Sequence, residues 1–122
     1  DPSEDRAAHQ DVVAALGVLA EHEPAAIAPL VKALGELPNE ARQVRLAAVK
    51  ALAGLKPSPA QIEGLTAALK DPWSAVRCEA AMSLGKLGAE AKSAVPALQE
   101  AAKDMLGVVH EAALEAIRAI QK

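Results

Sequence analysis

Aromatic side chains are almost absent from this sequence of 122 residues, which contains no Phe, no Tyr and a single Trp. Hydrophobic residues nevertheless make up 52% of the chain, which argues against a disordered protein. Most of them are Ala, Leu and Val. A core of small side chains suits closely packed helices, whereas β-strands favour β-branched and aromatic residues. The composition therefore favours one all-α domain, and the length fits a single domain.

Long apolar runs, paired cysteines and an excess of basic charge are also missing. No segment approaches the roughly 18 apolar residues of a membrane-spanning helix, so no membrane partner is expected. The single cysteine, Cys78, excludes an intrachain disulfide and is compatible with a cytoplasmic protein without excluding export. With 13 basic and 16 acidic residues the net charge is −3, and nucleic-acid-binding proteins usually carry a basic footprint instead.

A helical motif recurs about every 33 residues. Four aligned segments begin at Ala8, Val44, Val76 and Val109, at spacings of 36, 32 and 33 residues. Within each segment the apolar residues recur with the period of an amphipathic helix. The aligned core positions are Ala8, Val44, Val76 and Val109; Val12, Ala48, Ala80 and Ala113; Leu16, Leu52, Leu84 and Ile117; and Leu19, Leu55, Leu87 and Ile120.

A second helical segment precedes three of these. Ile27, Ile62 and Val95 occupy equivalent positions in it, each followed three residues later by a Leu. The repeating unit is therefore a pair of helices, A and then B, and stacked pairs form a solenoid. We predict an α-α superhelix, a right-handed solenoid of antiparallel helix pairs, with seven helices. Their predicted ranges are 4–22, 25–37, 40–55, 59–70, 72–87, 91–104 and 107–121.

All of these helices belong to one predicted domain, residues 1–122, with repeats at 25–55, 59–87 and 91–121. The helix at 4–22 is a B helix without a preceding A helix. A solenoid unit needs neighbours to bury its apolar face, and the chain begins with Asp1 instead of Met. We therefore interpret the sequence as a fragment of a longer protein.

Several residues mark the ends of these helices. Asp71 and Pro72 are typical of an N-cap and the first helical residue. The sequence Ser-Pro-Ala-Gln at 58–61 matches a capping box. Asn39 is a suitable N-cap for the helix that follows it, and Gly88 is a suitable C-terminal stop.

The most regular repeat reads Asp71-Pro72-Trp73-Ser74-Ala75-Val76-Arg77, followed by Ala80-Ala81 and by Leu84-Gly85-Lys86-Leu87-Gly88. It resembles the short HEAT repeat, including the variety found in phycobilin lyases. The segment Ala94-Val95-Pro96-Ala97-Leu98 is similar to the start of helix A in that family. The resemblance covers nearly the whole chain. It implies a scaffold for another protein, a peptide or other domains of the same chain, without a cofactor.

HEAT repeats carry an Asp at the start of helix B and an Arg six residues later. From the resemblance we infer a ladder in which the Arg bonds loop carbonyls or the carboxylate of the neighbouring repeat. Incomplete pairs then predict weaker coupling towards the ends of the chain. The pairs here are Asp71/Arg77, Asn39/Arg45, Asp104/His110 and Ser3/His9, and only the first is complete.

The resemblance also implies that the B helices line a concave face that receives the partner. A rotation of about 100° per residue places Met82 opposite the core stripe of its helix. Leu46, Cys78, Met82 and Val108 then form an apolar strip with charged flanks, as in a protein interface. The alternative is that these residues pack sideways on neighbouring B helices. The candidate residues are Arg42, Leu46, Lys50, Trp73, Cys78, Glu79, Met82, Lys86, Val108, Glu111 and Glu115.

The only aromatic residue, Trp73, has two interpretations. It is either a binding anchor for a partner or an inter-repeat contact with Leu106, which occupies the matching position in the next repeat. Replacing Trp73 with Ala separates the two interpretations. The loss of a core contact lowers the stability of the fold, whereas the loss of a binding anchor leaves stability unchanged and weakens binding.

Catalytic chemistry finds little support in the residues. The pairs His22-Glu23 and His110-Glu111 invite comparison with deoxyhypusine hydroxylase, a HEAT-like iron enzyme with several His-Glu pairs. They are not equivalent positions of the repeat, and too few ligands are present for a metal site. Cys78 lacks the positive setting that activates a thiol for chromophore attachment. We predict no catalytic, cofactor or metal site, and no enzyme.

Two alternatives to a binding scaffold stay open. One is a non-catalytic accessory segment of a HEAT-like lyase or hydroxylase whose reactive residues lie elsewhere. The other is binding to a nucleic-acid backbone. The mixed charge of the B helices argues against that, since Glu79, Glu111 and Glu115 offset Arg42 and Lys50.

Overall fold

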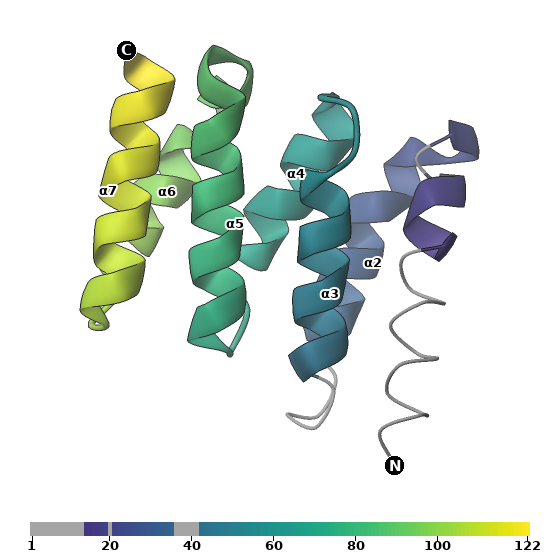
Figure 1. Ribbon diagram of the computed structural model, residues 1–122, viewed down its shortest axis with the longest axis horizontal. Helices are drawn as coiled ribbons and strands as arrows, with labels where there is room; N and C mark the ends of the chain where they lie inside the picture. Colours follow the sequence, from purple (N-terminus) through teal and green to yellow (C-terminus); the bar gives the residue numbers. More distant parts are fainter. Residues whose placement is uncertain (1–13, 20, 36–41) are drawn as a thin grey trace.

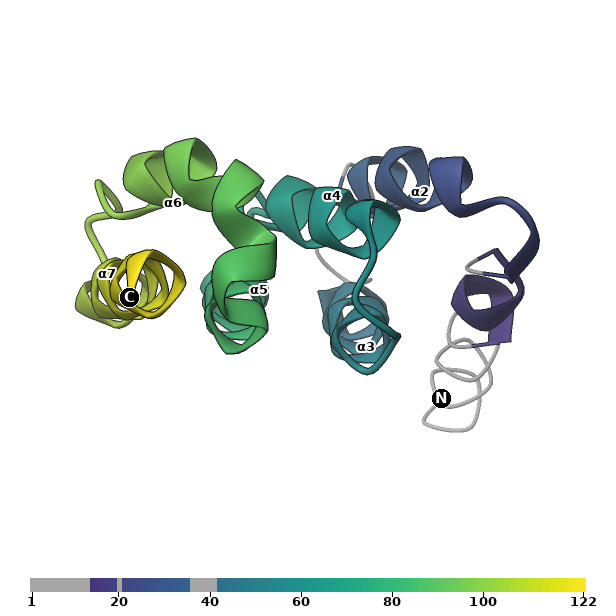
Figure 2. The ribbon, with the colours of Figure 1, turned by 90° about the horizontal axis from the view of Figure 1, so that it is seen from above.

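The structure is a computed structural model that describes residues 14–19, 21–35 and 42–122. These residues form two layers of helices and contain no strand (Figures 1 and 2). The predicted all-α solenoid is therefore confirmed. The A helices are α2 (Ile27–Gly35), α4 (Pro59–Ala68) and α6 (Val95–Ala101). The B helices are α3 (Arg42–Ala53), α5 (Ser74–Leu87) and α7 (Gly107–Gln121), and helical residues 14–19 continue their layer beyond α3.

Two short 3₁₀ helices replace parts of predicted α-helices. The first, η1 (Pro24–Ala26), leads into α2, and the second, η3 (Gly88–Ala94), joins α5 to α6. The helix predicted at 91–104 is thus shorter, because Ala91 inside η3 has non-helical angles (φ −96°, ψ 19°). Gly88 ends α5 as predicted. Its φ of 61° is left-handed, a conformation that glycine adopts without strain.

The helix predicted from Pro72 begins two residues later, at Ser74. Asp71 is not its N-cap: one carboxylate oxygen, Oδ1, accepts a hydrogen bond from the backbone N–H of Trp73 at 2.9 Å. This bond turns the chain while Trp73 stays extended (φ −93°, ψ 123°), so helical geometry starts only after it. Asp104 and Leu106 repeat the arrangement at 2.9 Å before α7.

Half of the predicted capping box forms at the start of α4. Ser58 Oγ accepts a hydrogen bond from the backbone N–H of Gln61 at 3.1 Å. The Gln61 side chain does not return to Ser58. It is fully buried and donates instead to the carbonyls of Leu52 (2.9 Å) and Leu55 (3.0 Å). Those carbonyls lie at the end of α3, where intrahelical partners run out, so Gln61 joins the two helices.

One apolar cluster runs through the stack between the two layers. Every predicted core position of the B helices that the structure describes is buried or half-buried. The buried surface is wider than a single stripe, because neighbouring B helices also pack sideways. Small residues permit this: a Cβ atom added to Gly85 would lie 3.0 Å from the Cα atom of Ala116. Almost fully buried positions outside the predicted stripe include Val49 and Ala116.

Candidate interaction surface

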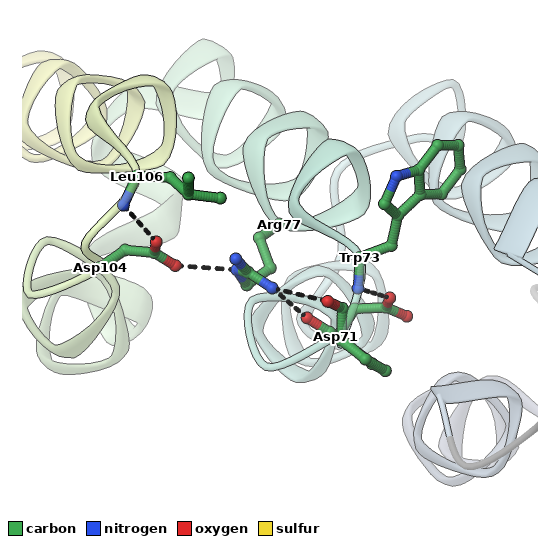
Figure 3. A network of polar contacts seen from close by, with 6 residues as sticks. Asp71, Trp73, Arg77, Asp104 and Leu106 are labelled. Carbon is green, nitrogen blue, oxygen red and sulfur yellow. Dashed lines mark hydrogen bonds and ion pairs between the residues drawn. The ribbon is translucent and has the colours of Figure 1, made fainter. Parts of the chain in front are cut away.

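Within residues 42–122, two ion pairs join successive repeats near the starts of the B helices. Arg45 Nε donates to Asp71 Oδ2 at 2.8 Å, and Arg77 Nε donates to Asp104 Oδ2 at 2.9 Å. Arg77 Nη1 also donates to the backbone carbonyls of Asp71 (2.8 Å) and Pro72 (3.0 Å), as Figure 3 shows. Arg77 thus makes both contacts proposed for the ladder, to loop carbonyls and to a neighbouring carboxylate.

The expectation of a single complete rung at Asp71 and Arg77 is wrong, because each rung takes its Asp from the following repeat. Arg45 has no Asp in its own repeat but pairs with Asp71. This rung is the more buried one, with side chains 1% and 5% exposed against 18% and 16% for Arg77 and Asp104. The more buried rung is therefore not the one whose motif is complete within one repeat. Asn39, Ser3 and His9 lie outside the described residues.

His110 occupies the ladder position of the last repeat. Its Nδ1 atom lies 2.5 Å from the backbone carbonyl oxygen of Ala102, in the loop that precedes α7. His22 lies far from it in sequence, is exposed, and has Nε2 3.7 Å from a carboxylate oxygen of Glu21. Within the described ranges, no three His, Cys, Asp or Glu side chains are grouped so that they could hold a metal ion.

Asp104 links the ladder to the pH dependence of stability. The N–H of Leu106 is the main cause that lowers the pKa of Asp104 below its usual 3.8, and the Arg77 guanidinium acts in the same direction, against burial. A carboxylate with a lowered folded-state pKa stabilises the fold above its usual pKa, and this contribution disappears as pH falls through the folded value.

Asp104→Asn keeps an oxygen acceptor but cannot ionise. We expect its urea midpoint to fall less than that of the wild type between about pH 6 and about pH 2. Equal decreases in the two proteins would exclude this role.

Trp73 is half-buried at the start of α5 and packs against the apolar core. The Cζ atom of Arg42, on α3, lies 5.2 Å from the centroid of its ring, which is a cation–π distance. Figure 3 shows the ring turned away from Leu106. The predicted contact with Leu106 is therefore wrong. Trp73 does connect two repeats, but its contact is with Arg42 of the preceding repeat and not with the following repeat.

We expect Trp73→Ala to lower the free energy of unfolding by about 1–2 kcal/mol, roughly half the cost of deleting a fully buried aromatic ring. The loss comes from the half-buried ring and its contact with Arg42. Urea unfolding followed by circular dichroism measures it. Leu106→Ala is the matched control, since Leu106 occupies the equivalent position but is 48% exposed. If Trp73→Ala left stability unchanged, the ring would instead be a free anchor for a partner.

The predicted apolar strip is only partly exposed. Met82 is 44% exposed and Val108 68% exposed, whereas Leu46 and Cys78 are half-buried and pack against the core. Leu46 and Cys78 are therefore partly used in packing against the core and are not fully available to a partner. Burial, with a smaller contribution from Glu79, raises the pKa of the Cys78 thiol, which disfavours a reactive thiolate.

In Figure 2, α3, α5 and α7 form one layer, and we call the surface of these helices that points away from the A layer the B-helix face. A rotation of about 100° per residue places the charged candidates on the sides of these helices away from the core stripe. Of these, Glu79 is half-buried, and the other charged candidates are exposed. Among the residues that the structure describes, Lys50, Glu111 and Glu115 form no ion pair. The exposed charged candidates are Arg42, Lys50, Lys86, Glu111 and Glu115.

Met82 borders a groove of about 330 Å³ between α5 and α7. Its floor is made of small residues, because Gly85 lets the two helices approach each other. Lys86 and Glu115 are charged groups at its border. Sequence reasoning identified these two residues and Met82 but missed the floor, since Ala is too frequent in this chain to stand out. The full lining is Met82, Gly85, Lys86, Ala112, Glu115, Ala116 and Ala119.

A larger hollow, of about 520 Å³, lies on the A layer between α2 and α4 and reaches Ala97 of α6. Lys32, Glu63 and Lys70 border it. A smaller hollow of about 260 Å³ continues from Lys70 and Ala97 towards Asp104. These positions were not predicted from the sequence, because the apolar pattern of the A helices indicates only core residues.

The layered helix pairs and the ladder between them define a helical-repeat protein. A family model of HEAT repeats matches residues 27–118, so the chain belongs to the HEAT-repeat family. No curated protein and no solved structure matches it significantly. HEAT repeats are generally protein-interaction modules and are typically not catalytic. No helix in the described ranges has both the length and the apolar character needed to cross a membrane.

Proposed function

We propose that this chain is a scaffold that binds another protein or a peptide on the B-helix face. The observation that carries the proposal is Met82, a flexible apolar side chain that is 44% exposed beside the groove between α5 and α7. An apolar centre with a charged border is typical of a protein interface. The thioether of Met adapts to differently shaped partners. Small floor residues leave room for a side chain of the partner.

The charges of this face support a protein partner over a nucleic acid. Lys50 and Lys86 are exposed there, but so are Glu111 and Glu115. A phosphate backbone is bound through a surplus of Lys and Arg, and carboxylates on the same surface repel it. A polypeptide can carry charges of both signs.

Selection from a random peptide library, displayed against the folded chain, tests this proposal. Amide chemical shifts of the chain should change around the groove when a selected peptide is added. Met82→Glu should weaken binding about tenfold or more, because it places a charge where an apolar group is desolvated. Met105→Glu is the matched control, since Met105 is 99% exposed and does not line the groove.

The proposal is wrong if selected peptides bind Met82→Glu as tightly as the wild type. It is also wrong if their chemical-shift changes gather around Lys32, Glu63 and Lys70 on the A layer. Circular dichroism of each variant verifies that the helices are intact.

A further inference from the structure

The charges of the B-helix face are ordered along the solenoid. Lys50 on α3, Met82 on α5 and Glu115 on α7 are 32 and 33 residues apart and thus hold equivalent positions of the repeat. Since the three helices pack side by side (Figure 1), these residues form a row across the face. The row runs from a positive charge, through the exposed Met82, to a negative charge.

In the part of the chain that the structure describes, only the negative end of this row has a second charge of the same sign nearby. Arg42 lies eight residues before Lys50, about 12 Å away along α3, where its guanidinium is over the ring of Trp73. Glu111 precedes Glu115 by four residues on α7, so the two exposed carboxylates are neighbours on one face of the helix. Like charges at this spacing repel each other, and a cation placed between them relieves that repulsion. Neither carboxylate has an ion-pair partner within the described part of the chain.

Two other cations limit where a bound peptide that crosses the B-helix face can place a basic residue. Lys86 and Arg118 are exposed on α5 and α7. They lie about one helical turn beyond Met82 and Glu115, towards the C-terminal ends of their helices. A basic side chain would be repelled at that level. The favourable level for a bound cation is therefore next to Glu111 and Glu115.

We propose, building on the protein-binding function above, that the partner is a peptide segment with three features. An apolar side chain enters the groove beside Met82, a basic residue lies over Glu111 and Glu115, and an acidic residue lies near Lys50. Neighbouring packed helices are about 8–10 Å apart, so α3 and α7 are separated by about 20 Å. An extended chain covers this distance in about six residues. The basic residue is then one or two positions from the apolar anchor, and the acidic residue is about four positions away on the other side.

Three fluorescent peptides with the same apolar anchor and spacing test this charge order. The first carries the acidic and basic flanks as proposed, the second only acidic flanks and the third only basic flanks. Fluorescence anisotropy at low salt gives their dissociation constants. The wild-type chain should bind the mixed peptide about fivefold more tightly than either of the others, as expected for one or two exposed ion pairs. High salt should reduce this preference.

Charge reversal on one side of the face should redirect the preference. Glu111→Lys/Glu115→Lys makes both sides positive and should prefer the acidic peptide, whereas Lys50→Glu should move the preference towards the basic peptide. Glu63→Lys, on the A layer, is the matched control and should keep the wild-type order. All four positions are exposed, so these changes leave the core untouched.

The outcomes separate this inference from the proposed function. If all three peptides bind the wild type equally and Met82→Glu abolishes binding, the groove binds peptides but the charge order is wrong. If the reversed variants keep the wild-type preference, the charge order is wrong as well. Binding that is insensitive to Met82→Glu overturns the proposed function itself.

Discussion

Arg45→Leu is expected to lower the free energy of unfolding by about 3–5 kcal/mol, the usual cost of removing one partner from a buried ion pair. The Arg45 side chain is 1% exposed and bonds Asp71 at 2.8 Å. In the variant, the Asp71 carboxylate stays buried but has lost its ion pair with the guanidinium. Because the side chain is only 5% exposed, bulk water cannot solvate the charge in its place. Urea unfolding at neutral pH, followed by circular dichroism, measures the loss.

A double-mutant cycle separates the ion pair from the other contacts of these side chains. Asp71→Asn keeps an oxygen acceptor for the backbone N–H of Trp73 but removes the charge. The double variant Arg45→Leu/Asp71→Asn should lose less stability than the sum of the two single variants, because no buried charge is left unpaired. If the stability losses of the two single variants simply added up in the double variant, Arg45 would stabilise the fold by packing alone and not through the ion pair.

Arg77→Leu is the matched control in the next repeat. It removes the equivalent side chain, but the Arg77 side chain is 18% exposed, so water can partly replace its contacts. We expect a loss of about 1–2 kcal/mol. If Arg77→Leu proved as costly as Arg45→Leu, burial would not determine the strength of the rungs.

The direction of the ladder shows what sequence periodicity can and cannot predict. The spacing of Val44, Val76 and Val109 was sufficient to place the helices and their repeat, because a periodic apolar face is a local property. Pairing Asp71 with Arg77 followed the motif within one repeat. The actual partners, Arg45 and Asp71, meet only after one repeat is placed beside the next, and that displacement depends on how closely the helices pack.

The exposed surface was also predictable only where it depends on the local helical pattern. Helical geometry placed Met82 opposite the core stripe, and Met82 is exposed. The same reasoning placed Cys78 on the surface, but Cys78 is half-buried and packs against the core. Nothing in the local pattern gives the distance between two B helices. Gly85 was noticed only as part of the family motif, and its contact with Ala116 emerged from the three-dimensional structure.

This contact gives the second large expected effect. Gly85→Val should lower the free energy of unfolding by about 2–3 kcal/mol, which is the net cost of overpacking after a gain in helix propensity. The added Cβ atom would lie 3.0 Å from the backbone Cα atom of Ala116, which cannot move aside without displacing α7. Gly54→Val is the matched control, because the nearest atom to a Cβ there lies at an ordinary contact distance of 3.5 Å. Urea unfolding of both variants measures the difference.

The consequence of Gly85→Val should extend to binding. Gly85 and Ala116 both line the groove beside Met82, so a larger side chain at position 85 fills its floor and pushes the two helices apart. We therefore expect the variant to bind the mixed peptide more weakly even under conditions in which it is fully folded. Gly54→Val lies outside the groove and should bind like the wild type. If Gly85→Val were destabilised but bound the peptide normally, the close contact between α5 and α7 would serve the fold alone, and the peptide would lie elsewhere on the B-helix face.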